Sequence, residues 1–356
     1  MKPAPTAPAA SLEVALADRD TRHVSLGRRL ARVVVGFGAA ALLALVLAPL
    51  AGSTRVDLLR ALDPTIPFAA NVDAQILFVA RLPRTLAAAL VGSALAASGV
   101  VLQALLRNPL ATPFTLGISA GSSLAAMLAL TFGSALTIGG LSPVPFASFI
   151  GSIGAVSIVY GLARARRHGL STDVLLLAGV TLNAFFSALV LLVQYFADAA
   201  ETLRTVRWLM GTLDVASYVP IVTALPFFVA AAALFAWIAR PLNLLALGPD
   251  AAAARGVDVL GAQRVAFLSA SLATGAAVSL AGPIGFVGII VPHLVRLVVG
   301  ADHRLVLPGA ALLGAAFLTV CDVGARTLFA PMELPVGIIT AVTGGPFFLW
   351  LLVTRR

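Results

Sequence analysis

Lysine, cysteine and acidic residues are scarce in this sequence. Only 15 of its 356 residues are Asp or Glu, 11% are charged, and Lys2 is the sole lysine. The single cysteine, Cys321, excludes an intrachain disulfide and indicates a buried thiol. A Walker A loop needs a lysine beside its glycines to reach the phosphates of ATP. Because the sequence has no lysine there, the chain does not itself carry that ATP site.

Metal ligands and catalytic motifs are also sparse. The four histidines are His23, His168, His293 and His303, and no two of them have H-x-x-H spacing. The H-E-x-x-H motif, which places two zinc ligands on one helix face, is absent. We therefore predict no metal site and no catalytic residue. The formal net charge of +9 does not indicate a nucleic-acid partner, because no basic cluster is interleaved with aromatic residues.

Apolar residues are abundant, at 60% of the chain. Several apolar runs are longer than about 18 residues, the length that crosses a hydrocarbon core of roughly 30 Å. The sequence therefore predicts an all-α polytopic membrane protein with a single ten-helix transmembrane domain over residues 33–356. The ten predicted spans are about 33–51, 83–106, 115–132, 145–164, 174–197, 218–239, 265–282, 285–299, 305–329 and 335–353. The eighth is short enough for a half-length helix buried by its neighbours.

Basic residues orient these spans. Most of the 24 Lys and Arg residues fall on one side if the N-terminus is cytoplasmic, and an even span count then places both termini there. Residues 1–32 are predicted to be a disordered cytoplasmic tail that ends in a basic anchor of Arg22, Arg28, Arg29 and Arg32. The alternative is a cleaved signal peptide with its processing site at residues 48–51.

Small residues recur inside the spans. The stretches GSALAASG (92–99) and GAALLGAA (309–316) place glycine and alanine where two helices can approach closely. We expect most of these glycines to serve tight packing within one subunit.

One polar stretch interrupts the apolar pattern between the sixth and seventh spans. It reads RPLNLLALGPDAAAARGVDVLGA (240–262) and predicts short helices on the cytoplasmic surface. Gly248 and Pro249 predict a turn with proline at a first helical position, and Asp250 follows in the first turn. A protruding helix of this kind is a surface that a soluble motor protein can grip.

Charges inside the spans are few. Only Asp322 and Arg326 lie clearly within one, at i, i+4 spacing, which is also the spacing of an ordinary helix ion pair. A carrier driven by an ion gradient usually buries ionisable groups at mid-membrane. The sequence therefore favours a pore-forming chain that receives work from a partner, with a gradient-driven secondary transporter as the alternative.

Five stretches resemble the permease subunits of ATP-binding-cassette (ABC) importers for iron-siderophores, haem and vitamin B12, the FecCD or BtuC-like type. The resemblance runs through nearly all of the chain after residue 30, in family order. The matching stretches are RLPRTLAAALVGSALAASGVVLQALLRNPLATPFTLGISAG (81–121), RWLMGTL (207–213), PLNLLALGPDAAAARGV (241–257), GPIGFVGIIVPHLVRLVVGADHRLVLPGAALLGA (282–315) and ELPVGIITAVTGGPFFLWLL (333–352).

This resemblance implies a type II ABC importer permease with ten spans, working as a homodimer. It implies that residues 241–261 form coupling helices that seat in a cleft of the ATPase subunit. The coupling positions it implies are Leu247, Gly248, Pro249, Asp250, Ala252, Ala253, Arg255, Gly256 and Val257. Arg255 would either pair with an acid of the partner or cap its own helix end.

The resemblance also assigns roles on the outer face and along the pathway. Arg81 and Arg326 would receive acidic residues of a periplasmic binding protein, with Arg84 a weaker candidate. The translocation path would run along residues 174–214 and 335–350, lined by Asn183, Gln194 and Met210. Helix packing explains each of these three positions equally well.

The resemblance implies a bacterial inner-membrane complex of two permease copies, two ATPase subunits and one periplasmic binding protein. ATP and Mg²⁺ would be used by the ATPase subunits, and this chain would bind no cofactor. The pathway is mainly apolar with few fixed charges, which suits a flat porphyrin better than a polar chelate. We therefore expect haem as substrate, with a ferric siderophore or cobalamin as the alternatives.

Overall fold

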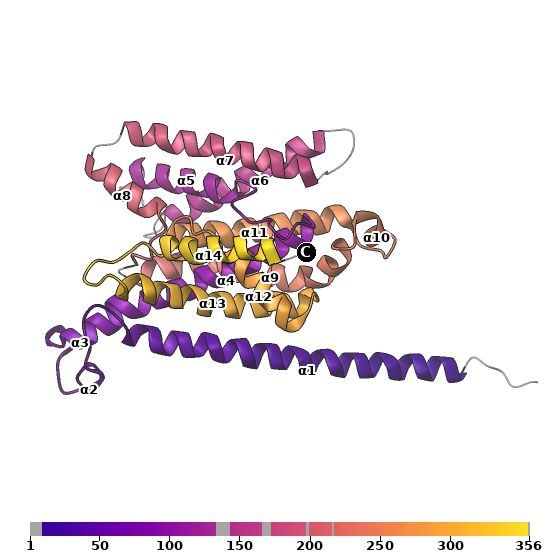
Figure 1. Cartoon of the computed structure of the whole chain (residues 1–356), viewed down its shortest axis with the longest axis horizontal. Coiled ribbons are helices and arrows are strands. Elements are labelled where there is room, and N and C mark those ends of the chain that lie inside the picture. The colour runs from indigo at the N-terminus through magenta and orange to yellow at the C-terminus, as the bar shows by residue number, and fades with distance from the viewer. Residues whose placement is uncertain (1–8, 133–142, 166–171, 197–198, 216, 355–356) are drawn as a thin grey trace, which may run out of the picture.

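We describe a computed structural model of the whole chain (Figure 1). The structure describes residues 9–132, 143–165, 172–196, 199–215 and 217–354. Within these ranges all regular structure is helical. The helices are α1 (Ala9–Leu47), η1 (Ala48–Leu50), α2 (Leu58–Ala61), η2 (Phe68–Ala70), α3 (Val72–Gln75), η3 (Ile76–Arg81), α4 (Leu82–Leu105), α5 (Ile118–Phe132), α6 (Val144–Ala165), α7 (Thr172–Tyr195), α8 (Ala199–Leu209), α9 (Val219–Leu245), α10 (Pro249–Ala253), α11 (Val259–Ala281), α12 (Val287–Val299), α13 (His303–Thr327) and α14 (Val336–Thr354).

Each of the ten predicted ranges overlaps one of the longer helices, although several helices extend beyond the predicted bounds. Among the described residues, seven helical stretches are long and apolar enough to cross a membrane, and they include parts of α1, α4, α6, α7, α9, α11 and α13. In the remaining three predicted spans the apolar helical stretches are shorter, at Ile118–Phe132, Val287–Val299 and Val336–Trp350. The 13 residues of α12 reach about 20 Å, less than a hydrocarbon core, so the short eighth element is confirmed.

The N-terminal region differs from the prediction. Helix α1 begins at Ala9, so the expectation of disorder over residues 1–32 was wrong for residues 9–32, while residues 1–8 lie outside the described part. The sequence of this region is rich in alanine, leucine and arginine, which favour helix, so the first span continues into the tail without a break.

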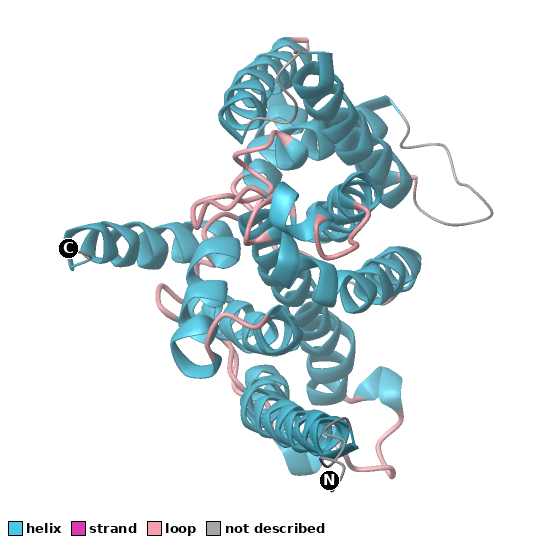
Figure 2. Ribbon diagram, turned by 90° about the vertical axis from the view of Figure 1, so that its right-hand side faces the viewer, coloured by secondary structure: helices cyan, strands magenta, loops and turns pink. Residues whose placement is uncertain are grey.

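The helices form a layered bundle. Figure 1 shows α5, α6 and α7 on one side, α1 on the opposite side, and α4, α9 and α11–α14 between them. Helix α4 lies near the centre of the bundle, and 83% of the most apolar 18-residue stretch of the span that contains it is buried. Figure 2, turned by 90°, shows the C-terminal helix α14 projecting from one side of the bundle.

The two ends of the bundle carry different elements. The end of α14, the beginning of α1 and the short helix α10 lie toward one end of the bundle, and α2, α3 and α8 lie at the other (Figure 1). The short helices between α1 and α4, and α8 after α7, were not among the predicted spans, because they are too short or too polar to register as apolar runs.

Two helix crossings depend on glycine. A Cβ on Gly92 of α4 would lie 2.1 Å from the carbonyl oxygen of Gly314 on α13. A Cβ on Gly99 would lie 2.1 Å from the carbonyl oxygen of Gly288 on α12. Backbone is therefore packed directly against backbone, which confirms the close approach expected from the stretches 92–99 and 309–316.

Candidate functional site

The predicted coupling segment folds into a compact turn and one short helix. Gly248, with φ of 116°, precedes α10, and Pro249 occupies the first helical position. Gly256, with φ of 79°, ends the turn, where a side chain would be strained. The N–H of Val257 donates to the carbonyl oxygen of Ala252 over 3.1 Å, which closes the segment on itself before α11 begins.

Most of the predicted coupling residues lie on the surface. Leu247 is 63% exposed and lies just beyond the end of α9. The other exposed members are Pro249, Asp250, Ala253, Arg255 and Gly256. Ala252 is fully buried and Gly248 is also buried, while Val257 is half-buried, so these three anchor the segment. The Arg255 guanidinium donates to the carbonyl oxygen of Ala251 over 3.2 Å, which caps its own helix.

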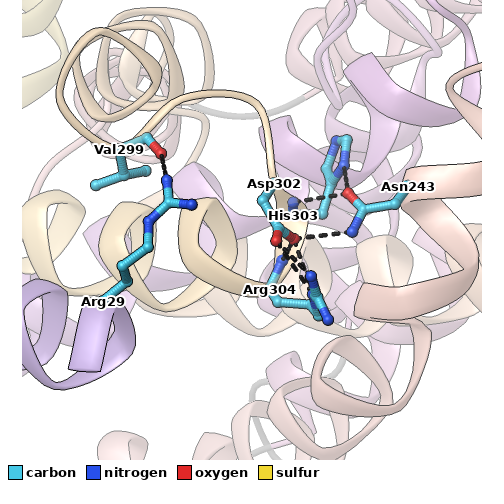
Figure 3. Close-up of polar contacts among 6 residues, drawn as sticks. All are labelled: Arg29, Asn243, Val299, Asp302, His303 and Arg304. Atoms are coloured by element: carbon cyan, nitrogen blue, oxygen red, sulfur yellow. Dashed lines mark hydrogen bonds and ion pairs between the residues drawn. The ribbon is translucent and has the colours of Figure 1, made fainter. Parts of the chain in front are cut away.

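A polar cluster joins the C-terminal end of α9 to the turn between α12 and α13 (Figure 3). The side-chain amide of Asn243 donates to Asp302 over 2.8 Å, and its oxygen accepts from the backbone N–H of His303 over 2.8 Å. The His303 Nδ1 lies 2.7 Å from the same oxygen. Because Asn243 stands four residues before Leu247, this cluster ties the start of the coupling segment to a second pair of helices. We call these four residues, Asn243, Asp302, His303 and Arg304, the base cluster.

Asp302 is the acidic member of the base cluster. It accepts from the backbone N–H of Arg304 over 3.0 Å as the N-cap of α13, and its carboxylate pairs with the Arg304 guanidinium over 2.7 Å. The hydrogen bond from Arg304 is the main cause that lowers the pKa of Asp302 from 3.8 to about 2, against a smaller opposing effect of burial. The carboxylate is therefore ionised across the physiological pH range.

Two further links join α1 and α4 to α12. The Arg29 guanidinium donates to the carbonyl oxygen of Val299 over 3.1 Å, at the last residue of α12 (Figure 3). Gln103 on α4 donates to the carbonyl oxygen of Gly288 over 2.9 Å and accepts from Arg296 over 2.6 Å. Side-chain hydrogen bonds thus link α1 and α4 to α12, and α9 to the start of α13.

The predicted docking arginines are buried at the other end of the bundle. Arg81 is 6% exposed and donates to the carbonyl oxygens of Pro49, Leu50 and Thr54. Arg326 is 3% exposed and donates to the carbonyl oxygen of Ala48 over 3.2 Å. Both guanidinium groups therefore hold the chain that follows α1.

A charged cluster surrounds Asp322 beside these arginines. Arg326 pairs with Asp322 at 3.2 Å, which confirms the i, i+4 ion pair considered from the sequence. Arg84 pairs with the other Asp322 oxygen at 2.9 Å and with Glu333 at 2.5 Å. The sequence did not indicate this second pairing, because Arg84 and Asp322 are 238 positions apart.

The three predicted pathway residues do not form one cluster. Asn183 and Gln194 are half-buried on α7, and Met210 is 45% exposed just after α8. The region of Met210 is joined to α14, because the N–H of Gly337 donates to the carbonyl oxygen of Gly211 over 3.0 Å. A Cβ on Gly337 would lie 2.2 Å from the carbonyl oxygen of Met210, so the end of α8 packs directly on the start of α14.

The base cluster is the part of this site that sequence reasoning missed. The Asn243 side chain is polar at the end of a long apolar helix, and Asp302 directly precedes a helix in a typical N-cap position. These signals locate each residue, but neither predicts that the two meet.

Comparison with known proteins gives one consistent result. The model of the FecCD transport family matches residues 12–354. The hemin transport system permease protein HmuU of Yersinia pestis is 43% identical over 277 residues, which cover 78% of this chain and 82% of that protein. The cobalamin import system permease protein BtuC of Halobacterium salinarum is 44% identical over 278 residues, covering 78% and 73%.

Structural comparison agrees. A solved structure described as a metal-chelate type ABC transporter in an inward-facing conformation superposes with a TM-score of 0.75. It is 32% identical and covers 91% of this chain and 99% of that one. These matches confirm the resemblance inferred from the five sequence stretches. The chain belongs to the FecCD transport family and is a multi-pass membrane permease of an ABC importer.

Proposed function

We propose that two copies of this chain form the membrane pathway of an importer that two ATPase subunits drive through the coupling segment. The observation that carries this proposal is the exposed, alanine-rich α10 segment, which lies between α9 and α11, with the end of α9 tied to the start of α13 by the base cluster. ATP and Mg²⁺ act in the ATPase subunits, and their closure moves the two coupling segments relative to each other. The permease itself makes and breaks no covalent bonds.

The proposed topology has ten crossing helices and cytoplasmic termini in the inner membrane of a bacterium. It is supported by a helix in each of the ten predicted ranges. It is also supported by the beginning of α1, the helix α10 and the end of α14, which lie toward the same end of the bundle in Figure 1. The coupling segment then faces the cytoplasm, where an ATPase subunit would be found.

The proposed dimer places α7 and α14 toward the partner copy. Both helices carry large exposed apolar side chains, including Leu191 and Tyr195 on α7 and Val342 and Leu349 on α14. Such faces need either lipid or a second protein surface against them. Asn183, Gln194 and Met210 are proposed to line the path at this interface.

Docking of a periplasmic binding protein at Arg81 and Arg326 is likewise a proposal. It is supported by their place at the end of the bundle opposite α10. Because both side chains are buried, direct contact with a partner requires that the segment after α1 moves aside during docking. Arg84 and Glu333 are the charged residues of that cluster closest to solvent, with side chains 15% and 47% exposed.

Haem is the proposed substrate, with a ferric siderophore or cobalamin as alternatives. The relative from Yersinia pestis, named as a hemin permease, supports haem. The Halobacterium relative, named for cobalamin, is equally similar, so sequence identity does not separate the two. Competition between haem, a ferric siderophore and cobalamin in an uptake assay with the cognate binding protein decides among them.

The experiment for the drive mechanism compares energy sources in proteoliposomes. The chain is reconstituted with and without its ATPase subunit, and uptake is measured with ATP or with an imposed proton gradient. We expect uptake only when ATPase and ATP are present. Uptake driven by the gradient alone would establish the secondary transporter instead.

Substitutions test whether ATP hydrolysis is coupled to uptake through the coupling segment. Asp250→Ala with Arg255→Ala should uncouple ATP hydrolysis from uptake, because both side chains are exposed on the proposed contact. The matched comparison is Arg255→Ala against Arg28→Ala, because Arg28 is an exposed arginine of α1 that lies outside the coupling segment, the proposed path and the docking end. We expect Arg28→Ala to retain parental uptake. Equal loss in Arg255→Ala and Arg28→Ala would contradict a specific role of the coupling segment.

A further inference from the structure

A groove runs between α1 and the pair α12 and α13, outside the site described above. Its volume is about 580 Å³, within the range of about 300–1,000 Å³ typical of small-molecule sites. The α1 wall consists of Arg29, Arg32, Val33, Gly36, Phe37 and Ala40. The opposite wall comes from the end of α12 and from α13, including Leu305 and Leu313.

We propose that this groove binds one anionic glycerophospholipid of the cytoplasmic leaflet. Arg29 and Arg32 would hold the phosphate, and the apolar wall that follows would take an acyl chain. The choice of leaflet rests on the proposed topology, which places the beginning of α1 in the cytoplasm.

The α1 wall has the order of groups that a lipid requires. Its members recur every three or four residues, so they share one face of the helix. The two arginines come first and the apolar residues follow. From Arg29 to Ala40 the helix rises about 16 Å, close to half of a hydrocarbon core of roughly 30 Å. Headgroup and acyl chain would therefore meet the residues suited to each.

The charges in the groove favour an anion. Among the described residues that line the groove there is no Asp or Glu, so within this part of the chain both arginines face the groove without a carboxylate beside them. Arg29 uses one nitrogen to donate to the carbonyl oxygen of Val299, which leaves further N–H groups for a phosphate. Guanidinium groups bind phosphate oxygens in paired hydrogen bonds, and basic pockets between helices on the cytoplasmic side bind lipid headgroups.

The middle of the groove is open. A Cβ built on Gly36 meets no heavy atom within 4 Å, although Gly36 lines the groove. A larger side chain at this position would therefore occupy space that the proposed acyl chain uses, without displacing protein atoms at its root. Gly27 offers a matched control, because its Cβ also meets nothing within 4 Å and it is not among the lining residues.

Lipid titration of the purified, delipidated full chain in detergent tests the proposal. The unfolding temperature is followed while phosphatidylglycerol or phosphatidylcholine is added. We expect a saturable rise with phosphatidylglycerol and at least tenfold weaker binding of phosphatidylcholine. Arg29→Gln with Arg32→Gln should weaken phosphatidylglycerol binding by about 30-fold, or about 2 kcal/mol at 1.4 kcal/mol per tenfold.

Two further variants separate the groove from general charge effects. Gly36→Leu should abolish the saturable response while leaving the arginines in place, and Gly27→Leu should preserve it. Equal responses to the two lipids, or parental binding by both the arginine variant and Gly36→Leu, would overturn the proposal. The assay needs neither ATPase nor substrate, so its failure leaves the proposed transport function standing, and failure of ATP-driven uptake leaves this site standing.

Discussion

The crossing of α4 and α13 offers a sharp test of the packing, through Gly92→Ala. The added Cβ would lie 2.1 Å from the carbonyl oxygen of Gly314 and 2.8 Å from the Cβ of Leu318. Ordinary contacts begin near 3.4 Å, so the two helices must separate by roughly 1 Å. Both neighbours belong to a helix rather than to a flexible side-chain end, so neither can move aside alone.

The expected cost follows from two opposing effects. Overpacking a close contact costs typically about 1–3 kcal/mol. Alanine gains about 1 kcal/mol over glycine in a helix interior. The net loss is therefore roughly 0–2 kcal/mol relative to the parent, and about 1–3 kcal/mol relative to a glycine-to-alanine change that meets no neighbour, which corresponds to a difference of a few degrees in the unfolding temperature. The crossing also lies about two turns from the Arg84–Asp322 pair, so separation of the helices would lengthen that ion pair as well.

Thermal unfolding of the purified protein in detergent measures this effect. Gly154→Ala on α6 is the matched control, because a Cβ there meets no heavy atom within 4 Å. We expect Gly154→Ala to be neutral or slightly stabilising. If Gly92→Ala unfolds at the same temperature as Gly154→Ala, the two backbones do not meet at this crossing and the packing described above is incorrect.

Three further predictions concern the polar clusters. Asn243→Ala removes the hydrogen bonds to Asp302 and His303, so we expect it to lower the unfolding free energy by about 2–3 kcal/mol. In a double-mutant cycle with Asp302→Ala, we expect a coupling energy of about 1 kcal/mol or more. The lowered pKa of Asp302 makes its ionised form stabilising at neutral pH, so the stability difference between Asp302→Asn and the parent should shrink as pH falls from about 4 to about 2. Arg84→Gln removes one of the two arginines that pair with the fully buried Asp322, and because Arg326 still pairs with it we expect a cost of about 1.5–3 kcal/mol, visible as reduced yield of folded protein.

The positions of the main helices were predictable from the sequence, because a long run of apolar residues indicates a helix that crosses the membrane. The surface position of residues 247–256 was also predictable, since a Gly-Pro-Asp turn and a second glycine interrupt two apolar runs. The same reasoning failed for residues 9–32. A polar, alanine-rich segment before a span is compatible with a disordered tail and equally with a helix that continues the span. Only the structure distinguishes these two possibilities.

The side-chain contacts were less predictable. An arginine at the end of a span reads as exposed, yet Arg81 and Arg326 are buried because carbonyl oxygens after α1 accept from them. Neither the pairing of Arg84 with Asp322 nor that of Asn243 with Asp302 leaves a local pattern. Their partners are far apart in sequence, and three-dimensional packing alone brings them together.

Accessibility of Leu247 measures the central claim most directly. In a Cys321→Ala background, Leu247→Cys is treated with a membrane-impermeant maleimide in sealed vesicles of known orientation, with and without the ATPase subunit. We expect labelling only from the cytoplasmic side and strong protection when the ATPase is bound. Labelling from the periplasmic side, or equal labelling with and without the ATPase, would contradict transport driven through this segment.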